Sequence, residues 1–321
     1  MATAVTNPPN DLTAPVSPRI LPNGKPSLSK LRMVWGATPF ILIHLLAFGA
    51  LWTGVNTIDV VVAVALYYIR MFGVTAGYHR YFSHRTYKMG RVAQFCMAFL
   101  AQSSSQKGAL WWAAHHRHHH KYSDEPEDVH SPRQRGMFYA HVGWLFDDTQ
   151  ETDYSKIKDF AKYPELVWLN KYWVVPPAVL GFAVWLWLGW SGLFIGFMAS
   201  TVALWHGTFT INSLSHVFGK RVYETTDDSR NSMILALITC GEGWHNNHHY
   251  YQASTRQGFE WWQIDMSYYV LKMLSWVGIV WDIREPPQKV LDGSWRHKRV
   301  DGATAPSAGE SPSAADMSAA A

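Results

Sequence analysis

Hydrophobic positions dominate two long stretches of the chain, and charged positions gather in the segments around them. Charged side chains are absent between Arg32 and Asp59 and again between Lys171 and Lys220. The second stretch is too long for one membrane crossing of about 20 residues and fits two. The pattern therefore predicts an all-α integral membrane protein with four transmembrane helices, near residues 34–53, 60–78, 173–190 and 193–212.

The distribution of Lys and Arg orients these predicted helices. The short turns at residues 54–59 and 189–192 contain neither residue type. By the positive-inside rule, both termini and the 79–172 segment then face the cytoplasm. The net charge of +4 fits this orientation and contact with lipid headgroups, and no basic patch suited to nucleic acid is evident. We expect a bacterial cytoplasmic membrane first and the endoplasmic reticulum second.

Composition divides the chain into three parts. Residues 1–31 lack a cleavable signal pattern, which predicts a flexible cytoplasmic arm. Residues 301–321 are mostly Ala, Ser, Gly and Pro, which predicts a disordered tail. Residues 32–300 form the membrane domain between them. Cys96 and Cys240 lie on or near the predicted cytoplasmic side, so we expect no disulfide.

Histidine is the most informative residue type in this sequence. Eleven of the 16 histidines fall into three boxes and one outlier: His79 and His84; His115, His116, His118, His119 and His120; His245, His248 and His249; and the outlier His216. Imidazole in such numbers, without cysteine partners, is typical of a metal centre that meets oxygen or water. All of them fall on the predicted cytoplasmic side, which was assigned from Lys and Arg alone. One metal site at that face is therefore predicted.

Spacing refines this prediction. Two triplets share the pattern H-x-x-H-H, whose three side chains fall on one face of a helix. They are His116, His119 and His120, and His245, His248 and His249. Two matching triplets predict two metal ions. His79 and His84 are five residues apart, about 140° out of register on an ideal helix, so His84 should lie past the helix end.

Other readings of the histidines remain. His115, His118 and His119 also fit H-x-x-H-H, so spacing alone leaves the register of the first triplet open. Five histidines lack a partner at ligand spacing and are interpreted as structural or interfacial: His44, His130, His141, His206 and His297. A solvated polyhistidine loop or an expression tag would explain the middle box alone, and the other boxes argue against it.

Five segments resemble those of a known family. HRYFSHRTYK, WWAAHHRHHHKYSD, GMFYAHVGWLF, NSLSHVFG and GEGWHNNHHYY, in this order and separation, resemble the membrane-bound fatty acyl desaturases of the stearoyl-CoA Δ9 type. The resemblance covers roughly residues 34–285, favours the later register, and implies a helical cytoplasmic cap with a di-iron centre. The implied ligands are His79, His84, His116, His119, His120, His216, His245, His248 and His249, with Asn212 reaching one metal through water. How the ligands divide between the two irons stays open.

The resemblance also implies a reaction. Two Fe²⁺ ions, O2 and two electrons would insert a cis double bond, at Δ9, into a saturated C16 or C18 acyl chain held in a bent apolar tunnel. The chain shows neither a His-Pro-Gly-Gly segment of a fused cytochrome b5 domain nor a dinucleotide-binding glycine fingerprint. Electrons would therefore come from an external donor such as ferredoxin, rubredoxin, or cytochrome b5 with its reductase.

Substrate length is expected to depend on the second helix. Tyr67 and Met71 precede His79 by twelve and eight residues, and related enzymes have the closed end of the acyl tunnel there. A bulky Met71 would shorten the tunnel and favour palmitoyl over stearoyl chains. The alternative is that Met71 only fills a gap in the core. Arg70, in the same helix, should face protein, water or a polar substrate group, or extend to the interface.

The acyl carrier is less well defined by the sequence. Gln106, Lys107 and Trp112 are expected to contact the substrate near its headgroup. However, Asp147 and Asp148 stand where mammalian relatives place a basic pair for coenzyme A, and carboxylates repel phosphate. Acyl-CoA is the expected carrier and a lipid-linked acyl chain is the alternative.

Two rival functions use the same residues differently. A membrane di-iron hydroxylase would insert oxygen into a fatty acid or lipid, although the segment from Asn212 to His216 favours desaturation. A zinc-dependent membrane hydrolase or a metal-handling protein would need about four ligands, usually with a carboxylate base. Nine clustered histidines exceed that need.

Overall fold

The computed structural model describes residues 30–146 and 151–293, with side chains from Thr38 onward. Most of the expected N-terminal arm, the expected tail, His297, Asp147 and Asp148 lie outside the described residues. Helices dominate the part that is described, and one small antiparallel sheet joins β1 (Lys88–Met89) to β2 (Val280–Trp281). In this sheet Lys88 pairs with Trp281 and Met89 with Val280.

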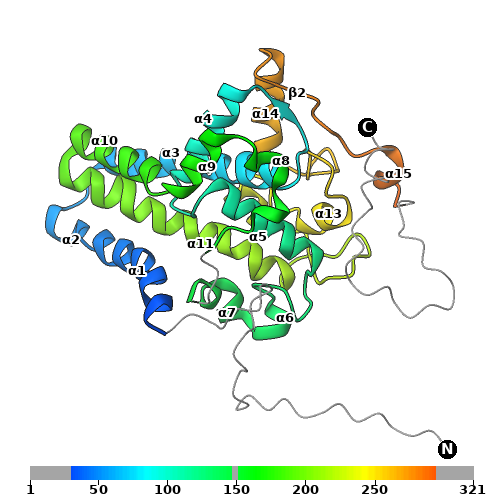
Figure 1. Cartoon of the computed structure of the whole chain (residues 1–321), viewed down its shortest axis with the longest axis horizontal. Coiled ribbons are helices and arrows are strands. Elements are labelled where there is room, and N and C mark those ends of the chain that lie inside the picture. The colour runs from blue at the N-terminus through cyan, green and yellow to red at the C-terminus, as the bar shows by residue number, and fades with distance from the viewer. Residues whose placement is uncertain (1–29, 147–150, 294–321) are drawn as a thin grey trace, which may run out of the picture.

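Long apolar helices form one end of the molecule, where α1, α2 and α10 gather in Figure 1. The elements of this apolar bundle are α1 (Lys30–Ala47), α2 (Ala50–Thr53), α3 (Thr57–Phe72), η1 (Gly73–Ser83), α10 (Val175–Ser191), η4 (Gly192–Ala199) and α11 (Ser200–Asn212). η1 and η4 are π-helical and continue the helices next to them. η4 packs against α1, α3 and α10, which joins the bundle into one unit.

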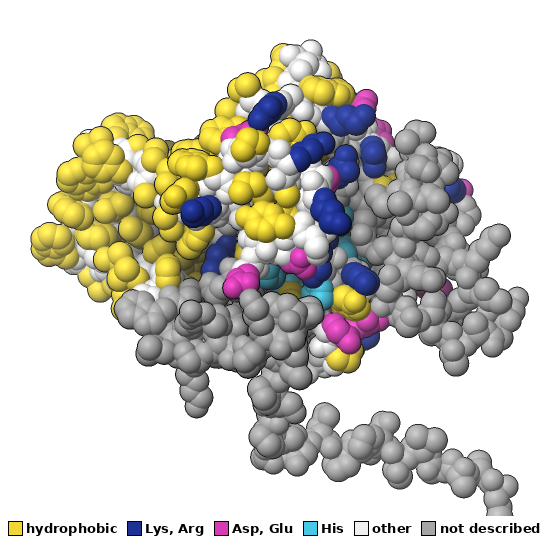
Figure 2. Space-filling view, in the orientation of Figure 1, with side chains coloured by type: hydrophobic (Ala, Val, Ile, Leu, Met, Phe, Trp, Pro, Cys, Tyr) yellow, Lys and Arg dark blue, Asp and Glu magenta, His cyan; other side chains and the backbone are white. Residues whose placement is uncertain are grey.

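Apolar side chains cover the outside of this bundle, which is the yellow surface at the left of Figure 2. Leu51 is 86% exposed, and Trp187 on α10 is 67% exposed. Water would disfavour so large an apolar surface, whereas lipid would not. Two helical stretches, Thr57–Ser83 and Val175–His216, are long and apolar enough to cross a membrane, and Thr38–Thr53 is a shorter apolar helix. The fold and composition thus indicate a membrane protein, and four separate crossings stay a prediction.

The helix boundaries differ from the expected ones for local reasons. Asp59 accepts a hydrogen bond from the backbone N–H of Asn56 at 3.2 Å, which favours the start of α3 at Thr57. The predicted pair 173–190 and 193–212 forms one 42-residue helical stretch, Val175–His216, interrupted at Gly189. Gly189 has φ 67°, a left-handed conformation that glycine adopts without a steric penalty. This glycine kinks the stretch near the end of α10, three residues before η4 begins.

Arg70 is fully buried inside the bundle. Its guanidinium donates hydrogen bonds to the Ser200 hydroxyl at 2.7 Å, the Thr201 hydroxyl at 2.6 Å and the Leu66 carbonyl at 3.0 Å. The side chain therefore faces protein, one of the environments expected for a charge in this helix. These bonds tie α3 to the start of α11.

Shorter helices form a cap at the other end of the bundle. They are α4 (Arg91–Gln102), α5 (Ala109–Lys121), α6 (Pro132–Arg135), α7 (Met137–His141), η2 (Gly143–Phe146), η3 (Tyr154–Lys156), α8 (Lys158–Ala161), α9 (Pro164–Lys171), η5 (Leu214–His216), α12 (Met233–Ile238), α13 (His245–Tyr250), α14 (Met266–Trp276) and α15 (Gln288–Leu291). α4 and α5 both pack against η1. The histidine boxes thus come together from η1, α5, η5 and α13.

Candidate metal centre

The π-helical geometry of η1 brings its two histidines together. The backbone N–H of His84 donates to the carbonyl of His79 at 3.1 Å, which is the i→i+5 bond of a π-helix. The two rings lie 4.8 Å apart, centre to centre. His84 lies just past the end of η1, as expected, but the helix continues beyond His79 to Ser83. The wider turn corrects the angular mismatch that an ideal α-helix would impose.

On α5 the structure adopts the later of the two possible registers. His115 turns away from the other boxes and bonds through Nδ1 to the carbonyl of Trp111 at 2.9 Å. His118 contacts the carbonyl of Glu127 at 3.1 Å and Lys156 Nζ at 3.0 Å. His116, His119 and His120 are the α5 histidines that join residues of the other boxes.

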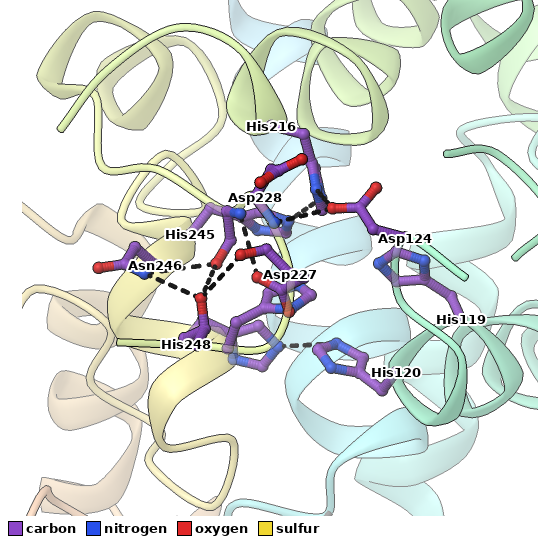
Figure 3. Close-up of polar contacts among 12 residues, drawn as sticks. His119, His120, Asp124, His216, Asp227, Asp228, His245, Asn246 and His248 are labelled. Carbon is purple, nitrogen blue, oxygen red and sulfur yellow. Dashed lines mark hydrogen bonds and ion pairs between the residues drawn. The ribbon is translucent and has the colours of Figure 1, made fainter. Parts of the chain in front are cut away.

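All nine implied histidine ligands meet in two groups within the described part of the chain. The five-histidine group consists of His79, His84, His116, His120 and His248, and the four-histidine group consists of His119, His216, His245 and His249. In each group the candidate ligand atoms lie within 4.8 Å of one another. Figure 3 shows His120 facing His248 across the boundary between α5 and α13. The structure thus supplies the division that spacing alone left open.

The separations between ring nitrogens suit metal ions. Nε2 of His116 lies 2.9 Å from Nε2 of His120 and 3.0 Å from Nε2 of His84, and Nε2 of His216 lies 3.2 Å from that of His245. Two nitrogens bound at right angles, each about 2.1 Å from one ion, would be about 3.0 Å apart. Nε2 of His249 is buried and has no hydrogen-bond partner. The residues therefore fit two transition-metal ions.

Asparagines fix the short helix α13. Asn246 accepts hydrogen bonds from the backbone N–H groups of Val222 at 2.8 Å and Tyr223 at 2.7 Å. Asn247 donates to the carbonyl of Gln257 at 2.8 Å and accepts from Asn231 at 2.6 Å. The two residues between His245 and His248 thus hold the box in place, since a helix this short has little stability of its own.

Four buried carboxylates support the histidines through Nδ1. Nδ1 of His119 donates to Asp128 at 2.9 Å, His216 to Asp124 at 2.8 Å, His249 to Asp227 at 2.5 Å, and His79 to Glu242 at 2.5 Å. Figure 3 shows Asp124 beside His216. Such bonds fix the tautomer so that Nε2 faces a metal. No sequence pattern indicated these carboxylates, although three of them lie close to a histidine box: Asp124 and Asp128 follow the second box, and Glu242 precedes the third.

Electrostatics favour the neutral form of several imidazoles in the five-histidine group and the charged form of the supporting carboxylates. Burial, reinforced by neighbouring imidazoles, holds the pKa values of His116, His120 and His248 well below their usual range. Burial would raise the pKa of Asp227, but the neighbouring His249 outweighs it and holds that pKa well below its usual value. Neutral imidazole offers a lone pair to a metal, so the site is poised to bind cations.

The remaining described histidines lie outside the two groups. His206 bridges His44 and His141, with ring nitrogens 3.1 and 3.0 Å apart, and His141 reaches the Ser213 hydroxyl at 2.9 Å. His130 lies near Asp128 and His119 and forms with them a third, overlapping cluster of potential ligands. His44, His141 and His206 thus connect α1, α7 and α11, as expected of structural residues.

Three expected substrate contacts converge on one turn of α11. Gln106 donates to the Thr208 hydroxyl at 3.0 Å, and the same hydroxyl lies 4.0 Å from Sδ of Met71. A Cβ at Gly207 would lie only 2.4 Å from the Tyr67 hydroxyl and 3.1 Å from Cε of Met71. Tyr67, Met71 and Gln106 therefore lie together around Gly207 and Thr208.

The other expected contacts lie apart from that turn. Trp112 stacks on His116, with ring centres 4.8 Å apart, next to the five-histidine group. The Lys107 ammonium lies over the rings of Trp111 and Trp173, at 5.7 and 5.6 Å. Asn212 is the last residue of α11 and is half-buried. Lys107 thus faces α5 and the turn between α9 and α10.

Comparison with known proteins assigns the chain to a family. The profile of the fatty acid desaturase family matches residues 52–275, which include every histidine of both groups. The chain belongs to the fatty acid desaturase family. This desaturase is 34% identical to the acyl-CoA C20 Delta5-desaturase of Anemone leveillei, over 71% of the chain and 74% of that protein.

Two further relatives of the desaturase are named as 9-desaturases that act on lipid-linked acyl chains. It is 33% identical to the sn-1 stearoyl-lipid 9-desaturase of Synechocystis, over 84% of the chain and 86% of that protein. It is 31% identical to the sn-2 palmitoyl-lipid 9-desaturase of Nostoc, over 69% of the chain and 80% of that protein. The protein is thus an oxidoreductase of the Δ9 acyl desaturase type, acting on fatty acyl chains, and its histidine groups are compatible with a di-metal site.

Proposed function

We propose that this desaturase inserts a cis double bond at Δ9 of a saturated C16 or C18 acyl chain, using O2 and a di-iron centre. The observation that carries the proposal is the convergence of nine histidines into two adjacent ligand groups. Two iron ions would be held by these groups, with Asn212 reaching one of the ions through a water molecule. When bound, they would supply the oxidant that removes one hydrogen from each of two neighbouring carbons.

The chain's own residues place the substrate. Trp112, stacked on His116, offers an aromatic wall beside the five-histidine group. Thr208, which contacts both Gln106 and Met71, is proposed to line the acyl path together with them. Apolar walls exclude water, and fixed positioning selects which two carbons face the metals. Met71 is proposed as the residue that limits chain length.

Four membrane crossings and a cytoplasmic active site belong to the same proposal. The apolar outer surface of α1, α2, α3 and α10 supports a bundle embedded in lipid. The distribution of Lys and Arg supports both termini on the cytoplasmic side. A bacterial cytoplasmic membrane is the proposed location. The two electrons would come from an external protein such as ferredoxin, rubredoxin, or cytochrome b5 with its reductase.

The carrier is proposed to be coenzyme A, with a lipid-linked chain as the second candidate. The names of relatives include both kinds of substrate, acyl-CoA in Anemone and acyl-lipid in Synechocystis. Purified enzyme with a reductase system would be given palmitoyl-CoA in one arm and vesicles of dipalmitoyl phosphatidylcholine in the other. Turnover of the vesicle lipid alone would overturn the coenzyme A assignment.

Expression in cells tests the reaction itself. Fatty acids from expressing cells would be analysed by mass spectrometry with double-bond location. The expected result is new Δ9 monoenes that disappear in His248→Ala and persist in the matched control His118→Ala, because His118 lies on α5 outside both groups. Hydroxylated acids, or no change despite iron in the protein and a supplied reductase, would refute the desaturase proposal.

A further inference from the structure

Carboxylates are distributed unevenly between the two histidine groups. Three of the four histidines in the four-histidine group donate Nδ1–H to a carboxylate of their own, at 2.5 to 2.9 Å. The three carboxylates are those of Asp124, Asp128 and Asp227, and each is at most 4% exposed. Three buried negative charges therefore stand directly behind this group.

Two of these charges receive their other hydrogen bonds from neutral donors. Asp124 accepts from the Ser131 hydroxyl at 2.6 Å and the backbone N–H of Asp228 at 2.8 Å. Asp227 accepts from the backbone N–H of Ser229 at 3.0 Å. Arg133, two residues after Ser131, pairs with the carboxylate of Asp228 at 2.5 Å and not with that of Asp124 or Asp227. The negative charge behind the four-histidine group is thus available to a bound cation.

The five-histidine group has a different environment. Among the described residues, one carboxylate, that of Glu242, supports one of its members, His79, and this carboxylate also pairs with Arg80 at 3.1 Å. Nδ1 of His120 is buried without a hydrogen-bond partner, and Nδ1 of His248 faces the Gln257 amide nitrogen at 3.5 Å. Arg80, which also pairs with Asp265 at 2.8 Å, therefore offsets part of the one negative charge that contacts this group.

These charges make the two metal positions unequal. A cation is attracted to buried anions a few ångströms away, and an imidazole bonded to a carboxylate is a stronger electron donor to its metal. Resting on the proposed di-iron function, we infer that the four-histidine group is the tighter and more electron-rich site: it fills with iron first and retains iron longest, and Asp124, Asp128 and Asp227 are positioning residues that set this order.

Stepwise loading of the full-length protein in detergent tests the order. Metal-free protein would be titrated anaerobically with ⁵⁷Fe²⁺ and followed by Mössbauer spectroscopy, which resolves iron in different environments. Below one equivalent, a single signal is expected, and a second signal should follow. The first signal should disappear in His245→Ala, which lacks a ligand of the four-histidine group, and persist in His84→Ala, which lacks a ligand of the other group.

Charge variants test the cause of the order. Asp227→Asn and Asp124→Asn keep a side-chain acceptor for the histidine but remove the charge. Each should weaken iron binding at the first-filled site about 10- to 100-fold and leave the second site unchanged. Asp228→Asn is the matched control, since its carboxylate pairs with Arg133 and contacts no described histidine. Glu242→Gln should weaken only the second-filled site.

Several outcomes would overturn the inference. Equal filling of both sites in the unaltered protein would do so, and that measurement requires no variant to fold. Iron binding by Asp227→Asn and Asp124→Asn that matches Asp228→Asn would also do so. Failure of the unaltered protein to bind any iron would instead remove the proposed function, and with it this inference.

Discussion

Met71 provides the sharpest test of how the fold selects its substrate. The side chain is 1% exposed on α3 and packs against Gly207 and Thr208 of α11. Met71→Ala removes three non-hydrogen atoms at the proposed closed end of the acyl path. The freed space fits about two further methylene groups of the substrate, each worth about 0.8 kcal/mol when buried.

The predicted change in selectivity follows from these values. Two methylenes contribute about 1.6 kcal/mol, which is roughly a 15-fold rise in the ratio of stearoyl to palmitoyl turnover. The assay is competition between equal amounts of palmitoyl and stearoyl substrate, with both monoenes measured by mass spectrometry. The variant should also lose about 2 to 5 kcal/mol of stability, since truncation of a buried methionine leaves a cavity.

A second methionine separates substrate selection from core packing. Met97 is 8% exposed on α4 and packs against Gly77 of η1, whereas Met71 packs against Gly207 of α11. Met97→Ala should destabilise the protein without shifting the chain-length ratio. If Met71→Ala lowers the melting temperature but leaves the ratio unchanged, like Met97→Ala, then Met71 only fills the core and the reasoning about the tunnel is wrong.

Three further predictions concern neighbouring positions. Gly207→Ala would place a Cβ 2.4 Å from the Tyr67 hydroxyl, so thermal unfolding should occur at lower temperature and palmitoyl turnover should fall; unchanged values of both would refute the close packing. Arg70→Met should lower the melting temperature, because it removes the hydrogen bonds that join α3 to α11, and should leave turnover near the original; lost turnover with intact iron would instead assign Arg70 a functional role. Burial lowers the pKa of Lys107 to about 8, so if its ammonium binds an anionic headgroup, KM should rise as pH increases through that value. Lys107→Arg, which stays charged, should abolish that rise, and a KM independent of pH in the unaltered enzyme would exclude the contact.

Much of the candidate site could be predicted because its residues recur at short intervals. The H-x-x-H-H spacing brings three histidines of one helix to the same region, and all six histidines of the two triplets lie in the two groups. Each triplet is nevertheless divided, because His119 of α5 and His248 of α13 lie in a different group from the other two members of their triplets. The choice between His115 and His116 could not come from spacing, since both registers fit. It depends on where α5 packs against η1, a contact between segments far apart in sequence.

Other features had no local signal. The π-helical turns of η1 bring His79 and His84 together, and the i→i+5 hydrogen bond that produces them appears only in the folded backbone. Asp227 lies 22 residues before the histidine that it supports, so no short motif links the two. The chain of His44, His206 and His141 likewise joins three helices and leaves no periodic pattern.

The sequence by itself thus indicated the mostly helical class, the apolar segments, the nine candidate histidine ligands and the family, because periodicity, charge and spacing are local properties of the chain. Only the tertiary structure decided how nine histidines divide into groups of five and four, which carboxylates stand behind them, and that Tyr67, Met71 and Gln106 meet at α11. The physical reason is that each of these depends on side chains from distant segments sharing a few ångströms of buried space. Packing of the cap against the bundle creates that proximity.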